Sequence, residues 1–98
     1  MPQKQLTNKM QARIYISGFV QGIGFRYFVR ANAKRLKLTG WVRNLPDGRV
    51  EALTQGSKEA IEKLVKFCEK GPFLSNVKSV QVEWGTGEEK FIDFQTIH

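Results

Sequence analysis

The chain has 98 residues, enough for one domain that buries about 60–70% of the surface of its unfolded chain without disulfides or a structural metal. Hydrophobic residues make up 41% of it and no apolar run approaches the length of a membrane span, so we expect a globular protein with no membrane association. Sixteen Lys and Arg against nine Asp and Glu give a formal net charge of +7. This charge implies an acidic partner, but it does not distinguish nucleic acid from a small anionic substrate.

The N-terminal residues and the cysteine content indicate the cellular compartment. Residues 1–11 are mostly polar and lack the apolar core of a signal peptide. The single cysteine, Cys68, cannot form an internal disulfide. We therefore predict a flexible N-terminal extension over residues 1–11, one domain over residues 12–98, and a reduced, cytoplasmic protein.

The first half of the domain predicts a strand, a loop and a helix. Residues 12–17 alternate in polarity, with Ile14 and Ile16 on one face, as in a half-buried strand. Glycines punctuate residues 18–24, and helical spacing of apolar residues begins at Phe25. The apolar stripe of this helix contains Phe25, Phe28, Val29, Ala33 and Leu36.

The middle of the chain predicts a hairpin and a second helix. Residues 39–45 and 49–55 resemble strands and are joined by Pro46-Asp47-Gly48, which favours a tight turn. Ser57 is a suitable N-cap for the helix that follows, and Gly71-Pro72 should end it.

Two further strands complete the expected elements. Residues 77–84 alternate in polarity, and residues 90–97 form a last strand in which Ile92 and Phe94 share a face. The order is strand, helix, strand, strand, helix, strand, with one strand added. Two helices with one apolar stripe each would cover one face of a mainly antiparallel sheet, so the predicted fold is α+β, a two-layer ferredoxin-like sandwich with an added C-terminal strand.

The glycine-rich loop predicts an anion site. Successive N–H groups in such a loop can converge into a nest, and the helix N-terminus behind it adds unpaired donors and a partial positive charge. Arg26 in the first helical turn is disfavoured by the helix dipole unless an anion shares the site, and its guanidinium could bind phosphate oxygens bidentately. Phosphate is the leading candidate. The alternative is that the glycines only allow a tight turn and that Arg26 points into solvent.

Two sequence blocks carry a resemblance to a known family. The run from Gly18 to Arg26 matches Gly-x-Val-Gln-Gly-Val-x-Phe-Arg, the signature of acylphosphatases, except that Ile23 replaces valine. Residues 40–44 followed by 47–51 resemble the second block of that family at the expected separation. The resemblance runs from about Ala12 to the C-terminus. It implies a ferredoxin-like fold and hydrolysis of a small-molecule acyl phosphate to a carboxylate and phosphate, without cofactor, metal or covalent intermediate.

The loop chemistry and the resemblance together assign the site. We predict phosphate binding by Val20, Gln21, Gly22, Ile23, Gly24, Phe25 and Arg26, and catalytic roles for Arg26 and Asn44. An asparagine amide oxygen can accept a hydrogen bond from water, although it cannot act as a base. The residue alone suggests a turn-associated asparagine. The resemblance instead assigns it the orientation of the attacking water.

Other reactive side chains fit structural roles better. Cys68 falls on the apolar stripe of the second helix, which indicates a core position rather than a nucleophile. His98 should be mobile and lack neighbours suggesting a relay, and the chain has no cysteine–histidine cluster of the kind that binds transition metals. Asp47 fits the turn and Glu51 should be a charge on a strand face, so they are not read as a catalytic carboxylate pair. Phe19 stands where many acylphosphatases carry a basic residue.

Two alternative functions remain. An RNA-binding module would also combine this fold with positive charge, but its aromatic-basic signature lies on the third strand, whereas here the aromatic run precedes the first helix. The other alternative is a module of a larger carbamoyl-transfer assembly. We favour a free-standing, monomeric enzyme with no nucleic acid partner.

Overall fold

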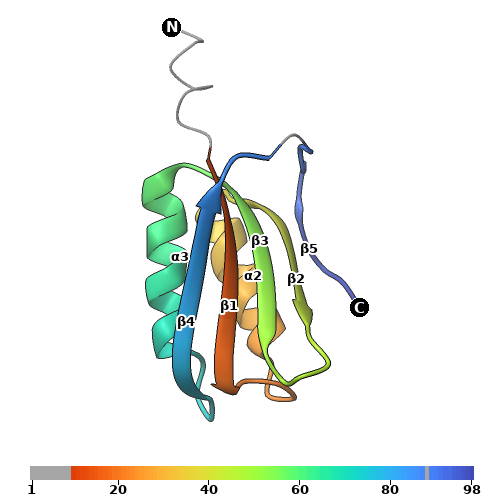
Figure 1. Cartoon of the computed structure of the whole chain (residues 1–98), viewed down its shortest axis with the longest axis vertical. Helices are drawn as coiled ribbons and strands as arrows, with labels where there is room; N and C mark the ends of the chain where they lie inside the picture. The colour runs from red at the N-terminus through yellow and green to blue at the C-terminus, as the bar shows by residue number, and fades with distance from the viewer. Residues whose placement is uncertain (1–9, 88) are drawn as a thin grey trace, which may run out of the picture.

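A computed structural model describes residues 10–87 and 89–98. The elements are β1 (Met10–Phe19), α2 (Phe25–Arg35), β2 (Thr39–Asn44), β3 (Val50–Gly56), α3 (Lys58–Lys70), β4 (Asn76–Gly85) and β5 (Phe94–Thr96). The five strands form one sheet in the order β4-β1-β3-β2-β5, and both helices pack on the same face of it (Figure 1). Among the strand pairs of these described residues, β2–β5 alone is parallel. The predicted two-layer ferredoxin-like sandwich with an added C-terminal strand is confirmed. No helix in the described part of the chain is long and apolar enough to cross a membrane.

Alternation along the strands separates a covered and an open face of the sheet. Ile14 and Ile16 are fully buried under the helices, as predicted, while Tyr15 between them lies on the open face. β1 begins at Met10, which pairs with Gly56, so residues 10 and 11 of the predicted extension belong to the sheet. The rest of that extension, residues 1–9, lies outside the described residues.

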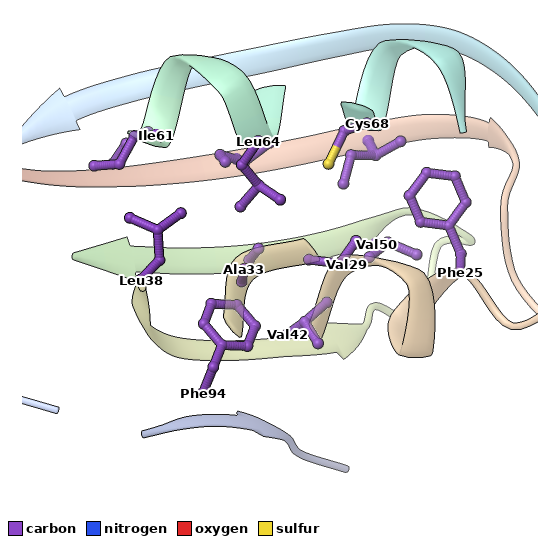
Figure 2. Packing of buried hydrophobic residues seen from close by; sticks show 14 of the residues in the cluster. Phe25, Val29, Ala33, Leu38, Val42, Val50, Ile61, Leu64, Cys68 and Phe94 are labelled. Carbon is purple, nitrogen blue, oxygen red and sulfur yellow. The ribbon is translucent and has the colours of Figure 1, made fainter. Parts of the chain in front are cut away.

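The two helices close the core over the covered face. The Ser57 hydroxyl accepts a 3.1 Å hydrogen bond from the Ala60 N–H and caps α3, and Gly71 ends this helix with φ 73°, both as predicted. Figure 2 shows buried side chains of α2, α3 and the sheet gathered in one cluster. Cys68 belongs to this cluster with no exposed surface, and burial raises the pKa of its thiol to about 12. The prediction that Cys68 is a core residue is confirmed.

Gly40, the first residue of the second block that resembles acylphosphatases, is required by the packing of two strands. Gly40 has φ 137°, and a Cβ at this position would collide with the carbonyl group of Leu53 on β3. The close approach of β2 and β3 therefore requires glycine here.

The last strand differs from its prediction. We expected a strand over residues 90–97 with Ile92 and Phe94 on one face, but β5 contains only Phe94–Thr96, and Ile92 is 98% exposed whereas Phe94 is fully buried. The chain leaves β4 at one edge of the sheet and must cross to β2 near the other edge, so the residues before Phe94 serve as a connection (Figure 1). The Phe94 N–H donates to Asp93 Oδ1 at 2.8 Å, and the Gly40 N–H donates to the Asp93 carbonyl at 2.9 Å. These bonds fix where the strand begins.

Candidate phosphate site

The topology brings the predicted site residues to one end of the sheet. β1 and β2 both run antiparallel to β3, so the loop after β1 and the residue that ends β2 meet at the same end (Figure 1). An open pocket of about 360 Å³ lies there. It is lined by Val20, Gly22, Gly24, Phe25, Arg26, Tyr27, Asn44 and Thr96.

The loop backbone has the conformation of an anion nest. Gly22 and Gly24 adopt φ 78° and 82°, and a Cβ at either position would meet no atom within 4 Å. Glycine is therefore needed here for the left-handed backbone and not for space. Gly24 is also the N-cap of α2 and provides no side-chain cap. Residues 21–27 donate none of the backbone–backbone hydrogen bonds found among the described residues, which leaves their N–H groups available to a ligand.

Arg26 adds positive charge to this pocket. The first turn of α2 contains no acidic residue, so the guanidinium and the helix N-terminus act in the same direction on an anion. Arg26 Nη1 lies 3.2 Å from His98 Nδ1. A guanidinium can only donate, so His98 Nδ1 is the acceptor when this contact forms a hydrogen bond. The sequence did not predict this contact, which forms because β5 carries the C-terminal residues past α2.

Asn44 is the last residue of β2 and lines the same pocket as the loop. It is partly buried and pairs with Val50 on β3. No hydrogen bond within residues 10–87 and 89–98 involves its side chain, and the residue lines the pocket, as Thr96 does. The amide can therefore accept from one group in the pocket and donate to another.

Two of the predicted phosphate-binding residues do not line the pocket. Ile23 is partly buried and packs against the hydrophobic cluster. Gln21 turns its side chain away: Nε2 donates to the carbonyl oxygens of Leu45 at 2.8 Å and Arg49 at 2.9 Å. Their backbone N–H groups still belong to the loop that forms the nest.

Sequence reasoning missed two lining residues. Tyr27 is 71% exposed at the edge of the pocket, and Thr96 arrives from β5 through its parallel pairing with Val42. Tyr27 directly follows Arg26 and could have been considered from that adjacency. No local signal connects residue 96 with residue 42.

Glu51 and Asp47 lie outside the pocket. Asp47 Oδ1 accepts from the Arg49 N–H at 3.1 Å, which confirms its turn role. Glu51 is on a strand face as predicted, but it is only 2% exposed and is paired with Arg13 at 2.6 Å and Arg43 at 2.7 Å. Burial alone would raise the pKa of this carboxyl, but the hydrogen bonds from the two arginines outweigh it and hold the pKa below its usual value.

Within the described residues, no group of three or more His, Cys, Asp or Glu side chains is placed to hold a metal ion. The residues that line the pocket offer backbone N–H groups, a guanidinium and a carboxamide. This set suits an oxyanion rather than a cation.

Known proteins resemble this chain over most of its length. Residues 12–96 match the family model named Acylphosphatase. The chain is 47% identical over 83 residues to the acylphosphatase of Trichormus variabilis, covering 85% of this chain and 79% of that protein.

Two solved structures extend the comparison. An acylphosphatase from Coxiella burnetii superposes with a TM-score of 0.91 at 35% identity, covering 96% of this chain and 98% of that one. HypF from T. kodakarensis superposes with a TM-score of 0.80 at 28% identity, covering 91% of this chain but 12% of the HypF chain.

Proposed function

This chain belongs to the acylphosphatase family and hydrolyses acyl phosphates, and we propose that the pocket formed by residues 20–26 and Asn44 is where it does so. One observation carries the proposal. The left-handed Gly22 and Gly24, the start of α2, Arg26 and Asn44 all line a single pocket, although Asn44 lies on a different element from the loop.

In this proposal the loop and Arg26 hold the phosphoryl group. Its oxygens accept hydrogen bonds from the N–H groups of the nest and from the guanidinium, which spread their charge as the bond to the leaving group lengthens. A guanidinium matches two phosphate oxygens with two parallel N–H bonds, whereas a lysine ammonium offers only a point charge.

Asn44 orients the attacking water. Its amide oxygen accepts one hydrogen of the water and turns a lone pair of the water oxygen toward phosphorus, in line with the leaving carboxylate. The new bond joins the water oxygen to phosphorus, and the bond between phosphorus and the acyl oxygen breaks. The carboxylate leaves as an anion that needs no protonation at neutral pH. Both protons of the water pass to the product phosphate, which then releases one of them to solvent.

Inhibition by the product tests the site. Purified protein should hydrolyse benzoyl phosphate, and inorganic phosphate should raise the apparent KM while leaving kcat unchanged, because both ligands occupy the nest. EDTA should not change the rate. Noncompetitive inhibition, or amide chemical shifts that spare residues 20–26 when phosphate is added, would contradict this assignment.

The comparison with HypF is relevant to the alternative that this domain is a module of a larger assembly. A domain with this fold occupies about an eighth of that protein, so the same unit also occurs inside a longer chain. The monomeric state and the cytoplasmic location stay predictions, which light scattering of the purified protein and cell fractionation would test.

A further inference from the structure

We infer that Gln21 is a positioning residue: its side chain sets the distance between the phosphate loop and Asn44. The inference rests on the proposed function of the pocket and adds a role for a residue that does not line it.

The contacts of Gln21 connect two elements far apart in sequence. Gln21 belongs to the loop after β1, and its Nε2 donates to the carbonyl oxygens of Leu45 at 2.8 Å and Arg49 at 2.9 Å, the two residues that flank the β2–β3 turn. Only the NH2 end of the amide can donate to two carbonyls, so the partners also fix the orientation of the amide. Leu45 directly follows Asn44, and Gly22 directly follows Gln21. One side chain thus joins the neighbours of both halves of the site.

These bonds are not needed to complete the hairpin. The Leu45 N–H donates to the Arg49 carbonyl at 2.8 Å, and the Gly48 N–H donates to the Leu45 carbonyl at 3.1 Å. Each carbonyl that Gln21 binds therefore already accepts a backbone hydrogen bond. What the amide adds is a link between the hairpin and the loop.

The kinetic consequence follows from where each group acts. The nest and Arg26 bind phosphate whether or not the hairpin is in register, whereas Asn44 must place a water in line with the leaving group. Displacing a positioned group by about 1 Å can cost up to a hundredfold in rate. Loss of the Gln21 bonds should therefore lower kcat and spare phosphate binding.

The test is the substitution Gln21→Met, which keeps the length of the side chain and removes its donors. We expect kcat for benzoyl phosphate to fall at least tenfold, while the dissociation constant for inorganic phosphate, measured by calorimetry, changes less than threefold. Gln55→Met is the matched control. Gln55 Nε2 also bridges separate segments, donating to Gln11 and to the carbonyl of Glu89, but at a place outside the pocket, so this variant should keep wild-type kcat.

A double-mutant cycle with Asn44→Ala separates positioning from a general structural role. If Gln21 acts through Asn44, adding Gln21→Met to Asn44→Ala should lower the residual rate by less than threefold. Full additivity, an unchanged kcat in Gln21→Met, or an equal loss of phosphate affinity would each overturn the inference. If Asn44→Ala itself keeps a normal kcat, it is the proposed role of Asn44 that fails. If Asn44→Ala loses kcat but Gln21→Met does not, the positioning role of Gln21 is wrong and the proposed role of Asn44 stands.

Discussion

Arg26 and Asn44 line the same pocket, but replacing each should change phosphate affinity and kcat differently. Arg26 binds the phosphoryl group before and during the reaction, so Arg26→Ala should lose phosphate affinity and kcat together. Asn44 acts on water, so Asn44→Ala should keep phosphate affinity near wild type and lose kcat about a hundredfold, roughly 3 kcal/mol of transition-state stabilisation. Calorimetry with phosphate and steady-state kinetics on each variant measure the two effects. Arg26→Lys serves as the control for charge alone and should restore little.

Glu51 makes stability depend on pH. Its folded-state pKa is depressed, so the stabilisation is present above the unfolded-state pKa and is lost as pH falls through the folded-state pKa. Glu51→Gln should lower the free energy of unfolding by about 1–2 kcal/mol near pH 7, a modest value because both arginine partners are partly exposed. The difference from wild type should be smaller at an acidic pH below the folded-state pKa of Glu51, where the carboxyl is protonated, than at pH 7.

Urea denaturation at the two pH values measures this change. Glu62→Gln on the exposed surface of α3 is the matched control and should change stability little at either pH. An equal loss at both pH values would mean that shape, not charge, makes Glu51 important.

At the scale of single residues, the sequence predicted features that depend only on adjacent residues, such as backbone conformation and the start of a helix. Gly22, Gly24 and Arg26 carry their own signal, because left-handed backbone and a helix start leave a local pattern. The contacts of Gln21 and Glu51 could not be predicted. Each joins residues on separate strands or loops, and only the strand register brings those partners together.

At the element scale, β5 supplies a core residue from a very short strand. Phe94→Ala should lower the free energy of unfolding by about 3–5 kcal/mol, because it removes a fully buried aromatic ring. Ile92→Ala, two residues earlier, should change it by less than about 0.5 kcal/mol, because that side chain is 98% exposed. Chemical denaturation compares the two directly. Similar losses would mean that residues 90–97 form one continuous strand, as the alternation had suggested.

The other elements were predicted because their signals are local. Helical spacing, the Ser57 cap and the turn at residues 46–48 each act within a few residues. The position of β5 depends on where the chain crosses to the edge beside β2. That crossing is determined by the order of all the strands in the sheet. Alternation alone cannot distinguish a strand from the connection that leads to it.

At the scale of the whole molecule, a net charge of +7 should assist capture of an anionic substrate. Raising the salt concentration from about 10 mM to about 500 mM should raise the KM for benzoyl phosphate several-fold, because screening shortens the reach of the charges. The value of kcat should change little, since the bound phosphoryl group contacts its donors directly. A salt-independent KM would mean that only contacts inside the pocket matter.

The open face of the sheet argues against RNA binding despite the positive charge. Two of its rings, Tyr15 and Trp41, are already stacked by arginines: Arg49 lies 4.9 Å from the Tyr15 centroid, and Arg43 lies 5.1 Å from that of Trp41. Arg43 is in turn ion-paired with Glu51. We expect no gel shift with single-stranded RNA at physiological salt. A shift that Trp41→Ala abolishes and Arg26→Ala leaves intact would show a second function.

The buried Cys68 is a built-in chemical probe of how often the core opens. It is the only thiol in the chain, it has no exposed surface, and its pKa of about 12 leaves almost no thiolate at neutral pH. An alkylating reagent can therefore reach it only when α3 separates from the sheet. With reagent in excess, the labelling rate reports how often the core opens, without denaturant and without any introduced probe. Repeating the measurement with phosphate present would show whether a ligand in the pocket slows the opening of the core around Cys68.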